Sequence, residues 1–475
     1  PGGQEREWCD VEVLRTIRRR SLAKLRKEVE PVEQQTLARL FTHWQGVLTP
    51  RRGLDALLDA IENLQSAPLP ASLLETEILP ARIANYKPAD LDTLIAAGEV
   101  TWAGFEPIGE RDGRVGLYLA EKLPLLWPVT NTQQAASVIE SGSNTRDREE
   151  RIIEYLRTHG ASFFQNVHDG TGGGFPNETI EALWNLVWRG AITNDSLQAL
   201  RAYTNREASS TRKPARRVHN QQAAFRSRRT TPPTAQGRWV LHPAFGEVSR
   251  NATEWSHAEA QQLLQRYGVV FRETAHAENL PGGFSAVYDV FKALEESGKV
   301  RRGYFAAELG ATQFALPSAL DLLRSLRNKR AESDAEMVVL AATDPANPYG
   351  ALLRWPAVGE GVSLQRSVGA RVVLADGALV AYLRRGNPNI QVFLPEEEPQ
   401  RGQVMRALAR YFVVMAQMQE SDRGGMLVQT INGVAVAEHP MARVLLDAGF
   451  QAAPLGFNLR RNLPLLSAER PVGNA

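Results

Sequence analysis

The sequence predicts an α+β protein in which tandem winged-helix modules are followed by a small C-terminal β-barrel. Two observations lead to this fold class. A helix–glycine–strand pattern occurs three times before residue 330, and short apolar runs joined by tight-turn signals follow it. The chain has 475 residues, which is enough for roughly two to four domains.

Composition is that of a globular protein, with 43% hydrophobic and 23% charged residues. No run approaches the ~20 apolar residues of a membrane helix, and the N-terminus lacks a signal-peptide pattern. Cys9 is the only cysteine, which excludes internal disulfides and cysteine-rich zinc sites and is typical of a reducing compartment. The histidines are scattered. We therefore expect a cytoplasmic protein with no membrane partner and no metal site.

The three copies of the helix–glycine–strand unit share one spacing. Apolar residues three apart lie on one helix face. A glycine four positions further on can take the left-handed conformation that ends a helix, and a β-branched residue two positions later favours a strand. The copies are LDTLIAAGEV (91–100), LWNLVWRGAI (183–192) and FKALEESGKV (291–300).

This unit is typical of the second half of a winged-helix module, whose last helix can enter a major groove and whose wing can touch the DNA backbone. Asp112-Gly113 predicts the turn of the first wing. Helix pairs interrupted at Gly160 and Gly268 complete the other two modules. Winged helices also mediate protein contacts alone, and we expect roughly half of these modules to touch no nucleic acid.

The predicted organisation has six parts. They are an N-terminal helical or winged-helix-like module (1–69), winged-helix modules (70–140, 141–205 and 239–330), an arginine-rich flexible linker (206–238) and a β-barrel with flanking helices (331–475).

Arginine dominates the basic residues, because 8 lysines leave 47 arginines among the 55. A GC-rich genome would produce such an excess, so only clusters are informative. Residues 206–238 hold nine basic residues and one acid, Glu207, in a composition that cannot build a core. The segment is either a basic arm on phosphates or a solvated insertion. Its predicted DNA contacts are Arg216, Arg217, Arg228 and Arg229.

The stretch SGKVRRGYF (297–305) contains the end of the third helix, its glycine stop and a first wing strand. Successive strand side chains point to opposite faces, so Arg301 and Arg302 should have different partners. We expect one to meet phosphate or a neighbouring module. For the same reason Tyr304 and Phe305 should divide between the two faces, with Phe305 in the core.

After residue 330 the pattern becomes β-rich. Asp376-Gly377 and Asn432-Gly433 each join two apolar runs, which is a strong hairpin signal. Several short strands with tight turns predict a small barrel or a strongly bent sheet. Arg384 and Arg385, after the first hairpin, are predicted DNA contacts. Further strands are expected at 337–342 and 390–394, and helices at about 401–419 and 440–448.

The loop ATDPANPYGALLRWP (342–356) follows one of these strands. A base-processing pocket needs a carboxylate or amide to position water, and aromatic rings to stack on a flipped base. We therefore predict Asp344 and Asn347 as catalytic, and Tyr349 and Trp355 as DNA contacts. The alternative is a pair of ordinary Asp-Pro and Asn-Pro turns with Trp355 in the core.

Several long stretches resemble the C-terminal region of Lhr, the large helicase-related family of bacterial superfamily 2 DNA helicases. They include LPARIANYKPADLDTLIAAGEVTWAGF (79–105), QLLQRYGVVFRETAHAENLPGGFSAVYDVFKALEESGKVRRGYF (262–305) and the loop 342–356. The resemblance implies a non-motor part of an ATP-dependent 3′-to-5′ DNA translocase in DNA repair. ATP and Mg²⁺ would be bound by the motor, since this chain has no P-loop motif.

The resemblance also implies partners and alternatives. The partners would be single-stranded or tailed duplex DNA, a second copy of the chain, and the helicase motor of the same protein. A fold similar to AlkZ-type DNA glycosylases is implied as well. Three functions stay open: a DNA-binding and assembly module, a uracil-DNA glycosylase, and a purely structural platform. The Gln-x-Gln or Gln-x-Asp pair of the AlkZ type has no evident equivalent, and Gln313 is not part of one.

Overall fold

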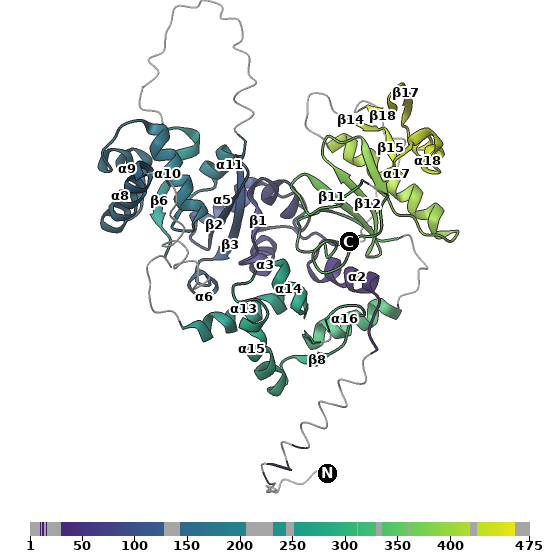
Figure 1. The fold of residues 1–475 in the computed structure, drawn as a ribbon, viewed down its shortest axis with the longest axis horizontal. Coiled ribbons are helices and arrows are strands. Elements are labelled where there is room, and N and C mark those ends of the chain that lie inside the picture. Colours follow the sequence, from purple (N-terminus) through teal and green to yellow (C-terminus); the bar gives the residue numbers. More distant parts are fainter. Residues whose placement is uncertain are drawn as a thin grey trace, which may run out of the picture. The chain divides into compact units, whose positions relative to one another are not determined.

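The computed structural model divides the chain into two compact units, Pro1–Arg327 (unit 1) and Asn328–Ala475 (unit 2) (Figure 1). Each is described by itself. No helix among the described residues is long and apolar enough to cross a lipid bilayer. The structure describes residues 10, 12–13, 16, 30–127, 143–205, 231–243, 251–310, 312–328, 335–359, 361–418 and 425–460.

The first module of unit 1 (residues 30–127) combines helices with a three-stranded antiparallel sheet of order β1-β3-β2. Pro88 at the first position of α5 fits the helix start, where no backbone donor is needed. The elements are α2 (Gln34–Trp44), α3 (Leu54–Leu64), β1 (Leu69–Pro70), α4 (Ala71–Leu73), a π-helical turn (Leu74–Ile78), α5 (Pro88–Ala96), β2 (Val100–Ile108), β3 (Asp112–Leu119) and α6 (Leu123–Leu126).

The second module (residues 143–243) has a sheet of order β4-β6-β5, in which Ile192 of β5 pairs with Leu241 of β6. The predicted linker 206–238 therefore joins two strands of one sheet and ends inside the second. Its arginines from 206 to 230 lie outside the described residues. The elements are α8 (Ser143–His159), β4 (Ser162–Phe163), α9 (Phe164–Gly170), α10 (Pro176–Trp188), β5 (Ile192–Asn194), α11 (Gln198–Thr204) and β6 (Arg238–Leu241).

The third module (residues 251–328) repeats this plan with a sheet of order β7-β9-β8. Phe305 lies in its core and Tyr304 is exposed, as predicted. The elements are α13 (Ala252–Tyr267), β7 (Val269–Val270), α14 (Arg272–Ala277), α15 (Ser285–Glu296), β8 (Arg301–Gly303), β9 (Gln313–Ala315) and α16 (Pro317–Asn328).

The glycine helix stops of the repeated unit are confirmed. Gly98, Gly190 and Gly298 have φ values of 78°, 66° and 79°, in the left-handed region that favours glycine. Gly160 and Gly268, the predicted breaks within the helix pairs, both have φ of 69°. These five positions therefore divide the helices where the sequence pattern predicted.

The predicted turn at Asp112-Gly113 is wrong. Asp112 pairs with Ile108, so the turn is made by residues 109–111 and Asp112 is the first residue of β3. Its carboxylate accepts hydrogen bonds from the backbone and hydroxyl of Ser72, at 3.1 and 2.5 Å. Asp112 therefore bonds Ser72 of α4 from the start of β3, and it does not lie in the turn.

Helix α10 of the second module packs against the wing of the first. A Cβ atom on Gly104 would lie 2.4 Å from the Val187 carbonyl oxygen, and one on Gly113 would lie 2.4 Å from the Trp188 ring. The Thr193 hydroxyl also donates to the Trp102 carbonyl at 2.5 Å. This face of α10 is therefore covered by protein, and the first wing serves module packing.

Unit 2 contains an open six-stranded sheet of order β10-β11-β12-β13-β15-β16 and a separate sheet of order β14-β18-β17. Among the described residues the end strands β10 and β16 do not pair, so the predicted closed barrel is not found. The strands are β10 (Met337–Ala341), β11 (Ala370–Ala375), β12 (Ala378–Arg384), β13 (Asn389–Val392), β14 (Gly425–Val428), β15 (Thr430–Ile431), β16 (Val434–Ala435), β17 (Gln451–Ala453) and β18 (Gly456–Arg460).

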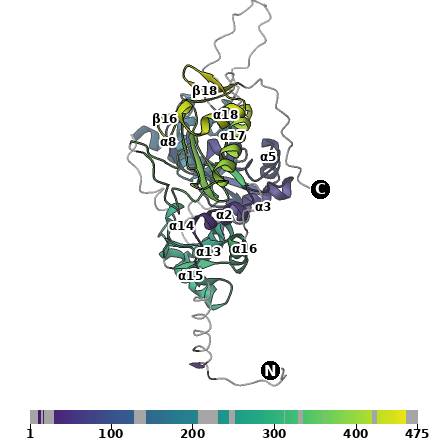
Figure 2. The same ribbon diagram turned by 90° about the vertical axis from the view of Figure 1, so that its right-hand side faces the viewer.

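Both predicted hairpins of unit 2 are confirmed. Asp376 and Gly377 have φ of 47° and 86°, and Asn432 and Gly433 have φ of 54° and 81°, as a two-residue primed turn requires. Helix α17 (Gln400–Met418) packs on strands of both sheets, as Figure 2 shows from the side. A shorter helix, α18 (Met441–Asp447), packs against it.

The close approach of α10 to the first wing predicts the effect of a methyl group there. Gly104→Ala should lower the free energy of unfolding by about 1–3 kcal/mol, because the new Cβ meets a backbone oxygen that cannot move alone. Gly359→Ala is the matched control, since its Cβ would meet no atom within 4 Å. Denaturant titration of both variants measures the difference, and equal stability would refute the packing argument.

Candidate functional site

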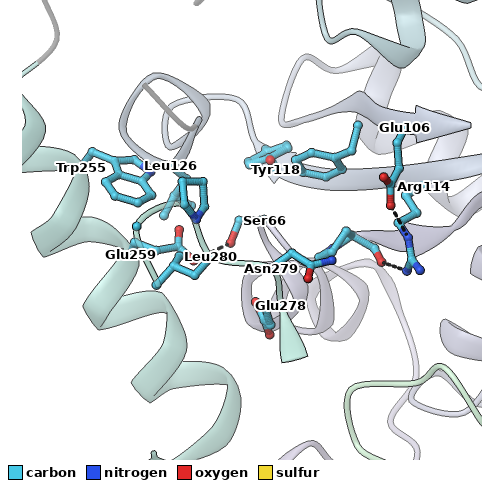
Figure 3. A pocket seen from close by; sticks show the side chains of 14 residues that line it. Ser66, Glu106, Arg114, Tyr118, Leu126, Trp255, Glu259, Glu278, Asn279 and Leu280 are labelled. Carbon is cyan, nitrogen blue, oxygen red and sulfur yellow. Dashed lines mark hydrogen bonds and ion pairs between the residues drawn. The ribbon is translucent and has the colours of Figure 1, made fainter. Parts of the chain in front are cut away.

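A pocket of about 410 Å³ opens in unit 1 where the first and third modules meet (Figure 3). The first module contributes Ser66, from the segment after α3, and Tyr118, from β3. The third module contributes Trp255 and Glu259, both from α13. The volume lies in the range of small-molecule sites. This pocket is therefore the candidate functional site of the described residues.

Helix α13 carries a row of buried polar side chains, of which Glu259 lines the pocket. Glu259, Gln262 and Arg266 are three and four residues apart, so they share one helix face. That face packs on the C-terminal end of α3, where the Gln262 side-chain amide donates to the carbonyls of Glu62 and Asn63 at 2.9 and 3.0 Å. The first module thus buries a polar stripe that an isolated helix would expose to water.

The Arg266 guanidinium is 0% exposed and joins the two modules. Its Nε donates to the Asn63 carbonyl and its Nη2 to the Ser66 hydroxyl, both at 3.2 Å. Nη2 also donates to the Gln65 carbonyl, and Nη1 forms an ion pair with Glu278. The buried charge is therefore paired and well hydrogen-bonded, which is the condition for tolerating it.

Glu259 carries the most perturbed carboxyl of the pocket. Burial raises its pKa from 4.5 to about 7; Arg266 opposes this rise and Glu278 adds to it. The Ser66 hydroxyl donates to Oε1 at 3.3 Å and also opposes the rise. A carboxyl that titrates near neutral pH inside a pocket is suited to proton transfer.

Two other polar groups of the pocket have no hydrogen-bond partner among the described residues: the Tyr118 hydroxyl and the Trp255 indole N–H. Tyr118 is completely buried and Trp255 is 8% exposed. Burial also raises the pKa of the Tyr118 hydroxyl well above its usual value, so the group stays a neutral donor. Buried polar groups are normally paired, so these two indicate a polar ligand or an ordered water.

The end of the pocket opposite Trp255 in Figure 3 is formed by the first wing. Arg114 of β3 forms a 2.8 Å ion pair with Glu106 of β2 and donates to the Pro68 carbonyl at 3.4 Å. Glu106 is exposed and Arg114 is half-buried. These contacts hold the wing against the pocket. Glu106 is the third carboxylate that lines it, beside Glu259 and Glu278.

Asp344 and Asn347, the predicted catalytic pair, lie together in the loop after β10, in unit 2. Each is 1% exposed. Asp344 Oδ1 accepts from the Ala346 backbone at 2.7 Å. The Asn347 amide donates to the Ala342 carbonyl at 2.8 Å, and its oxygen accepts from the Tyr349 backbone at 3.1 Å. These bonds fold the loop, and the catalytic assignment stays a prediction.

Tyr349 and Trp355 stack on each other, with ring centroids 6.4 Å apart. The Tyr349 hydroxyl is buried and donates to the Gly377 carbonyl at 3.0 Å, which ties the loop to the first hairpin. Trp355 meets Tyr382 edge-on at 5.6 Å. The structure thus brings the four predicted residues of this loop together, with their side chains bonded or stacked inside unit 2.

The predicted DNA-contacting arginines divide into three groups. Arg384 and Arg385 are exposed at the end of β12. The Arg301 side chain is half-buried and has no hydrogen bond or ion pair among the described residues. The Arg302 guanidinium lies 5.9 and 5.8 Å from the Tyr288 and Phe314 ring centroids and donates to the Thr312 hydroxyl at 3.5 Å. The two therefore differ, as strand alternation predicts. Arg216, Arg217, Arg228 and Arg229 lie outside the described residues.

The sequence analysis missed the pocket. Its residues are far apart in the chain: Ser66 and Glu259 are separated by 193 positions. Glu259, Gln262 and Arg266 do share one face of α13, but other positions of this helix are polar too, so their spacing alone did not mark a site. Among the described residues, no group of three or more His, Cys, Asp or Glu is placed to hold a metal ion.

The sequence of this chain is similar to a known family of domains and to curated proteins. The large helicase-related protein, winged-helix domain, matches residues 32–120 and 249–335. The predicted boundary at 69/70 lies inside the first of these ranges. "Lhr helicase/ probable uracil glycosylase" of Mycolicibacterium smegmatis is 40% identical over 471 residues, and "Lhr helicase/uracil glycosylase" of Escherichia coli is 34% identical over 490. Each alignment covers 96% of this chain and 30% of the relative.

A solved structure shares the fold. The Streptomyces sahachiroi DNA glycosylase AlkZ aligns with a TM-score of 0.50 at 14% identity, over 84% of this chain and 100% of that one. The likeness concerns the fold alone. It extends beyond single winged helices, since all of AlkZ is covered.

The raised pKa of Glu259 predicts that the free energy of unfolding depends on pH. A carboxyl whose pKa is higher in the folded than in the unfolded state stabilises the fold when protonated. That contribution is complete below about pH 4.5, falls as pH rises and is lost above about pH 7. In the unmodified chain, the free energy of unfolding should therefore fall by on the order of 3 kcal/mol between about pH 4.5 and pH 7. Glu259→Gln is neutral throughout and should abolish this fall. Glu254→Gln, exposed on the same helix, is the control in denaturant titrations from pH 4.5 to 8; an unchanged slope in Glu259→Gln would contradict the assignment.

Proposed function

The chain belongs to the large helicase-related family, and from this premise we propose that it is a DNA-binding, non-motor part of a helicase that acts in DNA repair. The observation that carries the proposal is the repeated winged-helix domain, matched at residues 32–120 and 249–335. The module is a common DNA-binding element. A fold like that of a DNA glycosylase is consistent with the same partner. The chain spans 30% of its curated relatives, so their motor, with ATP and Mg²⁺, is a proposed partner.

The third module is the better candidate for the DNA-contacting wing. Helix α10 of the second module is covered by the first wing, and α5 is bound by Arg201, which donates to Asp92 at 2.9 Å and to the Pro88 carbonyl at 3.3 Å. In the third module, Lys292 and Lys299 are exposed beside half-buried Arg301. These basic groups near α15 and β8 suit contacts with phosphates.

Arg301→Ala tests this proposal. We expect a few-fold weaker binding to a single-stranded oligonucleotide at low salt, and a salt slope smaller by about one phosphate contact. Arg302→Ala is the matched control. Its side chain lies over two rings, so its removal should cost about 0.5–1 kcal/mol of stability with less effect on DNA. Fluorescence anisotropy across a salt series decides: absence of binding by the unmodified chain sinks the proposal, and unaltered binding by Arg301→Ala sinks the residue assignment.

Self-association is the second part of the proposal. Unit 2 exposes large apolar side chains, among them Leu446 and Leu455, the latter 65% exposed. Apolar groups of this kind are favoured where protein surfaces meet. Light scattering should give a mass above that of one chain, and Leu455→Glu should lower it. A monomer at all concentrations would leave DNA binding as the proposed role by itself.

Excision of uracil from DNA is a second candidate function. It is favoured by the names of two relatives, which align over 96% of this chain and both include a uracil glycosylase. The sequence analysis placed its catalytic group in the loop 342–356. Release of free uracil from a single-stranded oligonucleotide is the direct assay, and a chain that binds DNA without releasing uracil has only the first function.

A further inference from the structure

We propose that the pocket between the first and third modules receives a nucleobase turned out of the DNA strand, and that Glu259 is the catalytic carboxyl of base excision. The inference rests on the second candidate function and moves its site from the loop 342–356 in unit 2 to unit 1. The pocket holds about 410 Å³, which is within the range that accommodates a planar heterocycle.

The charges of the pocket favour a neutral ligand over a phosphate. Glu259, Glu278 and Glu106 all line it. Arg114, which also lines it, is engaged by Glu106 and the Pro68 carbonyl, and nearby Arg266 by Glu278 and backbone carbonyls. An anion would meet these carboxylates without a free cation in return. A phosphate therefore stays outside, where the basic groups of the modules are exposed. A base, which carries no charge, can enter.

The walls of the pocket suit a planar ring with hydrogen-bonding edges. Trp255, Tyr118 and Phe105 supply aromatic surface on which a base can stack. The Tyr118 hydroxyl and the Trp255 indole N–H are buried donors that have no partner among the described residues. Carbonyl oxygens, such as the two of uracil, would satisfy both donors. The unpaired groups thus match the chemistry of a pyrimidine base.

Excision of a nucleobase requires only a water molecule and a group that accepts a proton from it. A water oxygen forms a bond to C1′ of the sugar while the bond from C1′ to the base nitrogen breaks, leaving its electron pair on the base. The Glu259 carboxylate accepts a proton from that water, and the departing base then takes up one proton. The products are an abasic sugar and the free base, so no other reactant is required.

The groups around Glu259 determine when it can act. Ser66 faces it from the segment after α3, Arg266 from the next turns of α13, Glu278 from the end of α14 and Tyr118 from β3. Glu259 titrates near pH 7 among these groups. Because the carboxylate is the active form, the rate of excision should rise as pH increases through neutrality.

The experiment compares six proteins on a uracil-containing single-stranded oligonucleotide: the unmodified chain, Glu259→Gln, Leu280→Trp, Glu254→Gln, Asp344→Ala and Asn347→Ala. Leu280 lines the pocket, and a tryptophan there fills it. We expect Glu259→Gln and Leu280→Trp to bind DNA within about twofold of the unmodified chain but to release uracil at least ~100-fold more slowly. Glu254→Gln should be unaltered, and the rise of rate with pH should vanish in Glu259→Gln. Thermal unfolding checks that each variant is folded.

The outcomes separate the inference from the function beneath it. Loss of DNA binding by the unmodified chain would refute the proposed function itself. Binding without uracil release would refute the excision candidate, and the inference with it. Full release by Glu259→Gln and Leu280→Trp, with loss in Asp344→Ala or Asn347→Ala, would return the site to unit 2 and overturn the inference while sparing the function.

Discussion

The buried guanidinium of Arg266 is the contact on which the arrangement of the first and third modules depends. It is completely buried, it donates to the carbonyls of Asn63 and Gln65 at the end of α3 and to the Ser66 hydroxyl, and it pairs with Glu278. A charge buried this deeply is tolerated only when each of its donors is satisfied. The two modules must therefore meet in one register, because a shift of either would leave the charge unpaired.

That register also creates the pocket. The same helix face that carries Arg266 carries Glu259 about two turns earlier, and the same segment that receives Arg266 carries Ser66. A structural ion pair thus positions a carboxyl whose pKa lies near 7. The module contact and the candidate chemistry are consequences of one polar stripe.

The winged-helix modules of this chain differ in how far neighbouring protein segments cover their surfaces. The first wing lies against α10, where Gly104 and Gly113 allow backbone and ring to approach closely. Arg201 of the second module binds the start of α5. In the third module, the basic residues Lys292 and Lys299 are exposed. A helix–wing unit can therefore be predicted from its sequence, but the partner of each face depends on which neighbours cover it.

The sequence by itself determined the local elements of the protein. Gly98, Gly190 and Gly298 end helices, and Asp376-Gly377 and Asn432-Gly433 turn hairpins, because backbone preferences act over a few residues. Only the tertiary structure decided what these elements assemble into: an open sheet in unit 2, a loop whose Asp344 and Asn347 bond their own backbone, and a pocket joining Ser66 to Glu259 across 193 positions. Burial and pairing depend on neighbours from distant segments, and no local pattern encodes them.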